Sequence, residues 1–361
     1  MGDKRVRPVL IGPFSGPVHG VSVINNALHA LMVQRGVRPA IIDLSPGSWS
    51  RGLTYHVVRM ARTAGGLFRI LGAACASTRR RYVMHLDGGP GLVYNLALAL
   101  ALRVTGQAML FYHHSSRYVF ADSAMMRLLL RVAGGTPQVF CSGKMAALFF
   151  ERYRPEGQTL LINNAAWVTP APSTGNRGDG ERLRLGFLSA LSLEKGLGRA
   201  IDTLRTLRRR GVPAELAVAG AASDPAARQL LDRAGAEFGS ALLVRGLLQG
   251  QQSDAFRAGL DYFLFPSLYP HETQSLAVPE ALSAGVPVVA LDHRFVGEVV
   301  GQGGLLIAPT ADYASAAADW IQAGQGDLEE RRRRARRQFE VSRTEAAGQV
   351  DRLIAWSLGQ T

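Results

Sequence analysis

Two glutamates, Glu272 and Glu280, stand eight residues apart in a run that otherwise holds mostly small and apolar residues, HETQSLAVPEALSAGVPVVA. The surrounding pattern predicts a strand (DYFLFPS), a loop (LYPHETQ), and a helix that begins near Gln274 or Ser275 and ends at Gly285. Free N–H groups at a helix start attract anions, and carboxylates accept hydrogen bonds from hydroxyl groups. The spacing therefore favours a ligand that carries both a diphosphate and hydroxyl groups, such as a nucleotide sugar.

The alternative is that Glu280 is a surface helix residue and Glu272 an ordinary loop acid. The apolar neighbours of Glu280, which include Leu276, Ala277 and Ala281, leave little polar face on the helix and weaken this alternative.

The chain has 361 residues, enough for two domains of ordinary size. Short apolar runs alternate with longer helix-like segments along both halves. The runs are RPVLIG, PAIID, YVMHL, AMLFY, QVFCS and TLLIN in the first half, and LRLGFL, AELAVAG, ALLVRG, DYFLFP, VPVVALD and GLLIAP in the second. Near-continuous apolar strands of this kind are typical of parallel sheets that helices cover on both faces. The sequence therefore predicts an α/β chain with two doubly wound, Rossmann-like domains that face a cleft.

The domain boundaries follow from composition. Residues 1–172 are predicted to form an N-terminal acceptor-binding domain, and the Pro/Gly-rich segment 173–181 a linker. Residues 182–340 are predicted to form a C-terminal domain that binds the nucleotide sugar, and residues 341–361 a helix that packs back on the first domain.

Charge is distributed unevenly between the two halves. Residues 1–150 hold 17 Lys/Arg against four acids, a net charge of +13, whereas residues 151–361 are neutral. No acid occurs between Leu44 and Leu86, where arginines stand among apolar residues. Such a surface suits an anionic membrane, an anionic lipid carrier or nucleic acid, or is simply a solvated arginine-rich face. We expect Arg59, Arg62 and Arg69 to contact the acceptor or the membrane.

The run FLFPSLYPHETQSLAVPEALSAGVPVVALD resembles the signature of retaining glycosyltransferases of family 4, which have the GT-B fold. Glu272 and Glu280 match its E-x7-E element. Further similar segments follow the family's order and cover most of the chain: PFSGPVHGVSVINNAL, FYHHSS, LSALSLEKGLGRAIDTL, LAVAGAA, RGLLQGQQSDAFRAGLDYFLFPS and GEVVGQGGLLIAP. The resemblance implies an enzyme of the glycosyltransferase class.

The resemblance also implies catalytic roles. Glu272 binds the transferred sugar, and Lys195 neutralises the diphosphate leaving group. One of the adjacent residues His113 and His114 contacts the donor sugar near the reacting carbon, and the other is a candidate for a buried, hydrogen-bonded core histidine. Without the resemblance, Lys195 would be interpreted as an exposed residue before a helix.

Donor binding is implied for a second set of positions. Glu280 binds the ribose, and the backbone at Gln274, Ser275 and Leu276 binds the phosphates. Gly20 lets the backbone of the first domain approach the β-phosphate.

One position departs from the family pattern. Ala190 stands in the region where the family has a second phosphate-binding arginine. Either another side chain substitutes, with Arg294 and His19 as candidates, or donor binding depends on Lys195 alone.

The chain contains no D-x-D motif and no His/Cys cluster with ligand spacing. We therefore expect no metal and no cofactor beyond a UDP- or GDP-sugar donor. Retention of anomeric configuration follows from the resemblance, and the lack of an obvious covalent nucleophile disfavours double displacement.

The acceptor and the location are predicted from charge. We expect a lipid-linked or glycan acceptor, and a chain that sits peripherally on the cytoplasmic face of the plasma membrane, in bacterial polysaccharide or glycolipid synthesis. The N-terminus runs from charges directly into a short strand and lacks the pattern of a secretory signal. The alternatives are a catalytically silent GT-B relative, an inverting GT-B transferase and a basic protein that binds nucleic acid or another polyanion.

Overall fold

The computed structural model describes residues 6–16, 20–47, 52–75, 79–171, 182–222 and 224–360. The chain divides into two compact units. Unit 1 comprises Met1–Trp167 together with Glu345–Thr361, and unit 2 comprises Val168–Thr344. The predicted linker 173–181 lies outside the described residues.

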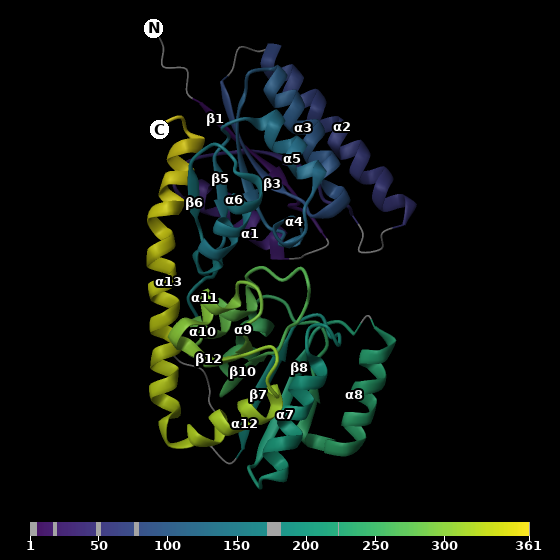
Figure 1. Cartoon of the computed structure of the whole chain (residues 1–361), viewed down its shortest axis with the longest axis vertical. Helices are drawn as coiled ribbons and strands as arrows, with labels where there is room; N and C mark the ends of the chain where they lie inside the picture. The colour runs from purple at the N-terminus through teal and green to yellow at the C-terminus, as the bar shows by residue number, and fades with distance from the viewer. Residues whose placement is uncertain are drawn as a thin grey trace. The chain divides into compact units, whose positions relative to one another are not determined.

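Unit 1 is built on one parallel sheet of six strands (Figure 1). The strands are β1 (Arg7–Gly12), β2 (Ala40–Asp43), β3 (Arg80–Leu86), β4 (Ala108–His113), β5 (Gln138–Phe140) and β6 (Thr159–Leu161). Their order is β2-β1-β3-β4-β5-β6. The chain thus winds one way from β1 to β2 and the other way from β3 onward, so the direction changes between β1 and β3.

The helices of unit 1 are α1 (Gly20–Gln34), α2 (Leu53–Cys75), α3 (Leu92–Val104), α4 (Arg117–Phe120), α5 (Ala124–Ala133) and α6 (Gly143–Tyr153). The hydroxyls of Ser123 and Ser142 accept hydrogen bonds from the N–H groups of Met126 and Met145, which caps the starts of α5 and α6. α2, α3 and α5 lie next to one another.

Unit 2 repeats this plan with a second parallel six-stranded sheet. Its strands are β7 (Leu183–Leu188), β8 (Ala214–Ala219), β9 (Leu242–Val244), β10 (Tyr262–Phe265), β11 (Val288–Leu291) and β12 (Gly304–Ile307). The order is β12-β11-β10-β7-β8-β9. The winding direction therefore changes between β7 and β10, which are hydrogen-bonded neighbours.

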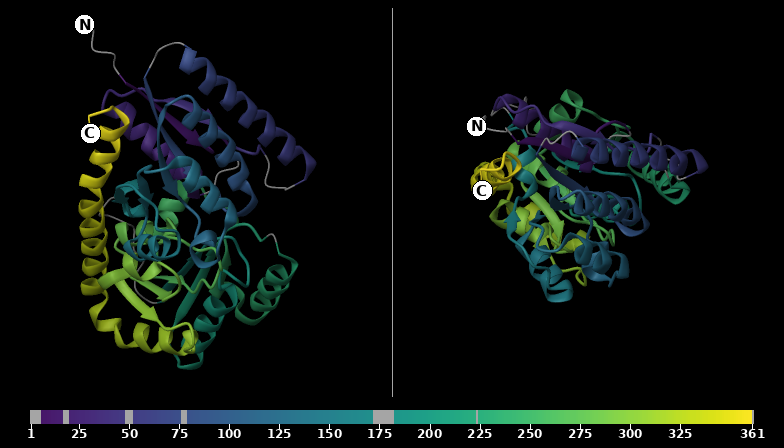
Figure 2. Two further views of the ribbon diagram at one scale, coloured as in Figure 1. Left: turned by 45° about the horizontal axis from the view of Figure 1, so that its top comes forward. Right: turned by 90° about the horizontal axis from the view of Figure 1, so that it is seen from above.

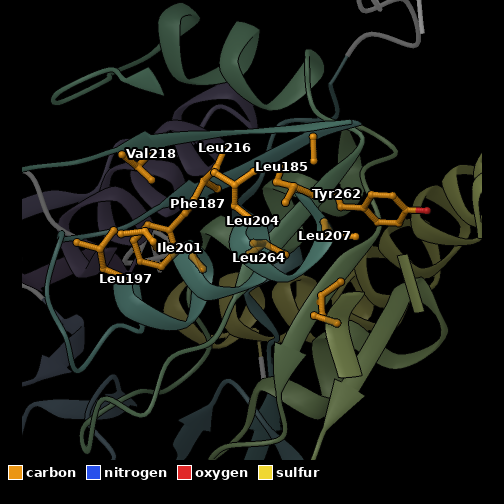
Figure 3. Close-up of a cluster of buried hydrophobic side chains, with 14 of the residues drawn as sticks. Leu185, Phe187, Leu197, Ile201, Leu204, Leu207, Leu216, Val218, Tyr262 and Leu264 are labelled. Carbon is orange, nitrogen blue, oxygen red and sulfur yellow. The ribbon is translucent and has the colours of Figure 1, made fainter. Parts of the chain in front are cut away.

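The helices of unit 2 are α7 (Leu197–Arg209), α8 (Pro225–Phe238), α9 (Gln251–Ala258), α10 (Ala277–Ser283), α11 (Val296–Val300) and α12 (Tyr313–Ala323). Leu197, Ile201 and Leu204 recur at helical spacing on α7 and are fully buried. Figure 3 shows them against Leu185 and Phe187 of β7 in the core of the unit.

The last helix, α13 (Leu328–Ser357), contributes to both units. In unit 1, Arg35 Nη1 lies 2.5 Å from Asp351 Oδ1, and the Arg81 guanidinium lies over the Trp356 ring. The arginine run at the start of the helix is engaged within unit 2. Arg331 packs on the Trp320 ring, and Arg332 pairs with Asp261.

All twelve predicted strands are present and both sheets are parallel throughout, which confirms the predicted fold class. None of the helices within the described ranges is long and apolar enough to cross a membrane.

Candidate active site

Lys195 and Glu272 form an ion pair at the point of unit 2 where the winding direction changes. Lys195 lies in the loop after β7 and Glu272 in the loop after β10. Because these two strands are parallel neighbours, the loops at their carboxyl ends meet. The Lys195 Nζ lies 2.8 Å from the Glu272 Oε2, which also accepts a hydrogen bond from Ser267 Oγ at 2.8 Å. In open α/β sheets this crevice is where ligands bind.

The surroundings hold the pair in place. Glu272 is only 6% exposed. The Lys195 ammonium lies 4.4 Å from the centre of the Tyr269 ring, a cation–π contact. The two loops are joined by a backbone hydrogen bond from Leu268 N–H to the Glu194 carbonyl. The result is a preorganised positive group beside a carboxylate.

Gly196, which follows Lys195, is required by the backbone. Its φ is +91°, and a Cβ there would lie 2.2 Å from the Pro266 carbonyl oxygen. Only glycine allows the β7 loop to approach the β10 loop this closely.

Glu280 has a different partner from Glu272. It lies in the first turn of α10, 3.1 Å from Arg257 Nη1 of α9. Arg257 is buried and also contacts Ser253 and Asp254. Burial raises the pKa of the Glu280 carboxyl, and the Arg257 guanidinium opposes that shift. The arginine orients the carboxylate by holding one of its oxygens.

The helix itself starts later than expected. α10 begins at Ala277, not near Gln274 or Ser275. Val278 N–H donates to the Ser275 carbonyl, so a tighter turn precedes the helix. The predicted end holds, because Gly285 follows the helix with φ +70°. No hydrogen bond joins the N–H of Ser275 or of Leu276 to another described residue, and both residues are partly exposed.

The second phosphate-binding arginine of the family is replaced by Ala190 in this chain, and the structure places Ala190 and one of its two candidate substitutes. Ala190 is exposed in the β7 loop. Arg294 lies after β11, the strand beside β10, with φ +62°. His19, the other predicted substitute, lies outside the described residues.

His293 is a candidate that no sequence motif marked. It follows β11 directly beside Arg294, and the Glu272 carboxylate is near enough to act on its charge. Burial lowers the pKa of His293, and Arg294 lowers it further. Its Nε2 is buried without a hydrogen-bond partner in the described part of the chain. The sequence feature that could have identified His293 is its position directly after the predicted strand VPVVALD, which becomes β11 beside β10.

In unit 1 the structure separates the two adjacent histidines. The His113 side chain is fully buried, with Nδ1 3.0 Å from Tyr118 Oη and Nε2 2.7 Å from Gln138 Oε1. Both ring nitrogens are thus engaged in the core, and burial lowers the His113 pKa to about 4. This engagement favours His114 over His113 for the donor role predicted for one of the pair. His114, one residue further, is partly exposed.

His114 is backed by a second histidine that the sequence analysis missed. His85, from β3, places Nδ1 2.8 Å from the His114 Nε2. The rings of His85, Tyr112 and His114 stack on one another. Burial lowers the pKa of His85 to about 3, so it is neutral near pH 7. A neutral His85 can fix which nitrogen of His114 carries the proton.

Arg59 is buried, contrary to the expectation that it is a surface cation. It is 4% exposed, pairs with Asp87 and lies over the Tyr94 ring. The Asp87 backbone N–H donates to Asn95 Oδ1, and the Asn95 side-chain amide donates in turn to the His85 carbonyl. Arg59 therefore belongs to the internal support of His85, and it is not available to a membrane or an acceptor.

The other two predicted surface arginines differ from Arg59. Arg62 is partly exposed, and its Nη1 lies 2.6 Å from Asp43 Oδ2. Arg69 is exposed and donates to the Ile41 carbonyl at 2.6 Å.

Asp43 anchors the loop after β1. Its carboxylate accepts hydrogen bonds from the hydroxyls of Ser15 and Ser45 and from the Phe14 N–H. Burial would raise the pKa of Asp43, but these hydrogen bonds outweigh it and bring the pKa to about 2. Gly20 opens α1 further along, where a Cβ would meet no protein atom.

A search of the described ranges finds no group of three His, Cys, Asp or Glu side chains that could hold a metal ion.

Comparisons with known proteins find similarity to glycosyltransferases. Residues 182–323 match the family model of glycosyl transferases group 1. The amylovoran biosynthesis glycosyltransferase AmsK of Erwinia amylovora is 26% identical over 152 residues, which cover 41% of this chain. The match spans only 37% of AmsK.

Solved structures match over nearly the whole chain. Anabaena Alr3699/HepE in complex with UDP superposes with a TM-score of 0.69 at 15% identity, covering 99% of this chain and 100% of HepE. HepE is also known in complex with UDP-glucose. Sucrose-phosphate synthase from Thermosynechococcus elongatus gives a TM-score of 0.62 at 15% identity, with 98% of each chain covered. The chain therefore shares the two-sheet GT-B fold of these solved structures, and its residues 182–323 are similar to the glycosyl transferases group 1.

Proposed function

We propose that this chain is a glycosyltransferase that moves a sugar from a nucleoside-diphosphate sugar to an acceptor. The observation that carries the proposal is the Lys195–Glu272 pair at the change of winding direction between β7 and β10. A sugar nucleotide places its sugar one bond away from its diphosphate. A cation and a carboxylate in contact match that combination of charge and hydroxyl groups.

The donor is proposed to be a UDP-sugar. HepE, which shares the fold, has been solved with UDP and with UDP-glucose. In this chain the N–H groups of Ser275 and Leu276 would donate to the diphosphate, next to Gln274. Glu280, held by Arg257, would accept from the ribose hydroxyls. Gly20 is assigned to the backbone approach to the β-phosphate.

In the proposed reaction the bond between the sugar C1 and the phosphate oxygen breaks, and its electron pair leaves with the nucleoside diphosphate. Lys195 stabilises the charge that develops on this leaving group. Glu272 keeps the ammonium in position and accepts a hydrogen bond from the sugar. The acceptor oxygen forms the new bond to C1, and its proton passes to the departing phosphate oxygen.

We further propose that attack and departure occur on the same face of the sugar, which retains the anomeric configuration. His114, supported by His85, would contact the donor sugar near C1. Lys195 and the backbone N–H groups supply the positive charge that other transferases take from Mg²⁺, so we expect activity to persist in the presence of EDTA.

The acceptor is proposed to be lipid-linked or a glycan, presented at the cytoplasmic face of a bacterial plasma membrane. The basic first half of the chain supports an anionic acceptor or surface. AmsK, named for the biosynthesis of the polysaccharide amylovoran, supports polysaccharide or glycolipid synthesis.

A thermal-shift series with UDP, GDP and ADP tests the donor site. A ligand at one hundred times its dissociation constant stabilises the folded state by about 2.7 kcal/mol, and we expect this for UDP. Mass spectrometry then follows the release of UDP from UDP-sugars, and NMR determines the anomer formed. Binding without turnover would indicate a silent relative, and no response to any nucleotide would contradict the proposal.

A further inference from the structure

Three helices of unit 1, α2, α3 and α5, lie next to one another (Figures 1 and 2). Together they expose an unusual amount of apolar surface. Seventeen large hydrophobic side chains are exposed in the described residues, and nine of them lie on these three helices. They are Leu53, Val57, Met60, Phe68 and Leu71 on α2, Val93, Leu100 and Val104 on α3, and Leu128 on α5. This concentration exceeds the scattered apolar residues of an ordinary surface.

The exposed residues of α2 form a continuous stripe. Leu53, Val57, Met60, Phe68 and Leu71 follow one another at intervals of three, four or eight residues, which places them on one face of the helix. Phe68 is 75% exposed and Leu53 80%. The buried residues of α2 include Thr63, Gly66, Ile70 and Ala73, and they lie on the opposite face. The stripe is therefore a second apolar face, directed away from the core.

The charges on these helices are all positive. α2, α3 and α5 contain no Asp or Glu. Arg69, Arg103 and Arg131 are exposed beside the apolar side chains, and Arg127 is exposed in a pair with Asp122. The face combines protruding apolar groups with uncompensated cations.

We propose that this three-helix face rests on an anionic lipid bilayer. Its apolar side chains insert among the acyl chains near the headgroups, and its arginines bind lipid phosphates. A second copy of the chain is a poor occupant, because it would bring the same cations against one another, and the adjacent Asp122 is already paired with Arg127. The inference deepens the membrane location within the proposed function and rests on it, but it does not depend on the donor site.

Vesicle flotation of the full chain tests the proposal. The vesicles are phosphatidylcholine with phosphatidylglycerol, compared with phosphatidylcholine alone. We expect binding to the anionic vesicles, and a loss of about tenfold or more in the double variant Phe68→Glu/Leu71→Glu. Val33→Glu and Val341→Glu, at positions of α1 and α13 that are about as exposed as Leu71, are the controls and should bind like the parent. Equal binding of the stripe variant and the controls would overturn the proposal.

A fluorescent probe identifies what covers the face. An environment-sensitive dye is attached at Phe68→Cys in a Cys75→Ser background, since Cys141 is buried, and at Val341→Cys as a control. A blue shift with anionic vesicles that spin-labelled lipids quench, seen only at position 68, supports the proposal. The absence of a blue shift at position 68 overturns the proposal. A shift that occurs without lipid and depends on protein concentration also overturns it and indicates self-association instead.

The same variants should bind UDP like the parent chain. If the variants lose vesicle binding but still bind UDP, the substitutions affect only the lipid-binding face. If the parent chain binds vesicles but does not bind UDP, only the proposed donor site is refuted.

Discussion

Replacing Lys195 tests the central assignment most directly. The ammonium is in contact with Glu272 at 2.8 Å, and both side chains are largely shielded, with 19% and 8% of their surfaces exposed. We predict that Lys195→Met weakens UDP binding, whereas Glu272→Gln leaves it unchanged or strengthens it. The signs differ because Glu272 competes with the diphosphate for the ammonium. Both variants should lose transferase activity, since the proposed reaction uses Lys195 to stabilise the leaving group and Glu272 to bind the sugar.

The magnitude follows from the contact. A hydrogen bond to a charged group contributes about 1.5–3 kcal/mol, and a tenfold change in affinity corresponds to about 1.4 kcal/mol. The UDP dissociation constant of Lys195→Met should therefore rise by about ten- to one-hundredfold. The substitution also strands the buried Glu272 carboxylate, which should destabilise the fold by about 1–3 kcal/mol. The double variant Lys195→Met/Glu272→Gln should recover much of this stability without recovering UDP affinity.

Isothermal titration calorimetry with UDP and urea unfolding provide the two measurements. Lys144→Met, the same chemical change at an exposed position of unit 1, is the matched control and should leave UDP affinity unchanged. If Lys195→Met bound UDP as tightly as the parent, or if Glu272→Gln weakened UDP as much as Lys195→Met does, the assigned roles would be refuted.

Three further predictions concern other parts of the fold. The pKa of Asp43 is about 2 in the folded chain against an ordinary value of 3.8 for aspartate. Its contribution to stability is therefore present above about pH 4 and is lost as the pH falls toward 2. Because Asp43 is partly exposed, we expect about 1 kcal/mol, seen as a shallower loss of stability in acid for Asp43→Asn than for the parent. Gly196→Ala should destabilise the chain by about 2 kcal/mol or more. Gly198→Ala, near the start of α7, should be neutral or slightly stabilising in the same urea titration, because its Cβ would lie 3.7 Å from Leu230 Cδ2, an ordinary contact. His85→Phe should lower kcat with little change in KM and shift the pH profile, because His85 orients His114 without touching the substrate; an unchanged profile would mean a purely structural role.

The strands were predictable because parallel strands that are covered on both faces are apolar almost throughout. Lys195 and Glu272 were singled out as candidates from their motifs. Their contact was not, because the two residues lie 77 positions apart and meet only through the pairing of β7 with β10. The strand order is a property of the whole sheet, and no local pattern encodes it.

Other sites depended on partners that the sequence does not reveal. From the sequence alone Arg59 is predicted to be a surface cation. The structure shows that it pairs with Asp87, which lies 28 residues away in the sequence. The adjacent histidines could not be separated from their types alone. Alternation along an extended strand puts Tyr112 and His114 on one face and His113 on the other. The two histidines were separated by the core partners of His113, Tyr118 and Gln138, which its sequence neighbours do not reveal.

The course of α13 has a consequence for synthesis on the ribosome. Ala346, Val350 and Leu353 are buried in unit 1, yet they emerge after the whole of unit 2. The first unit to be translated is thus the last to be completed. A nascent chain that stops after Thr344 would present a finished second unit beside a first unit with an uncovered apolar surface, a state suited to recognition by chaperones and proteases.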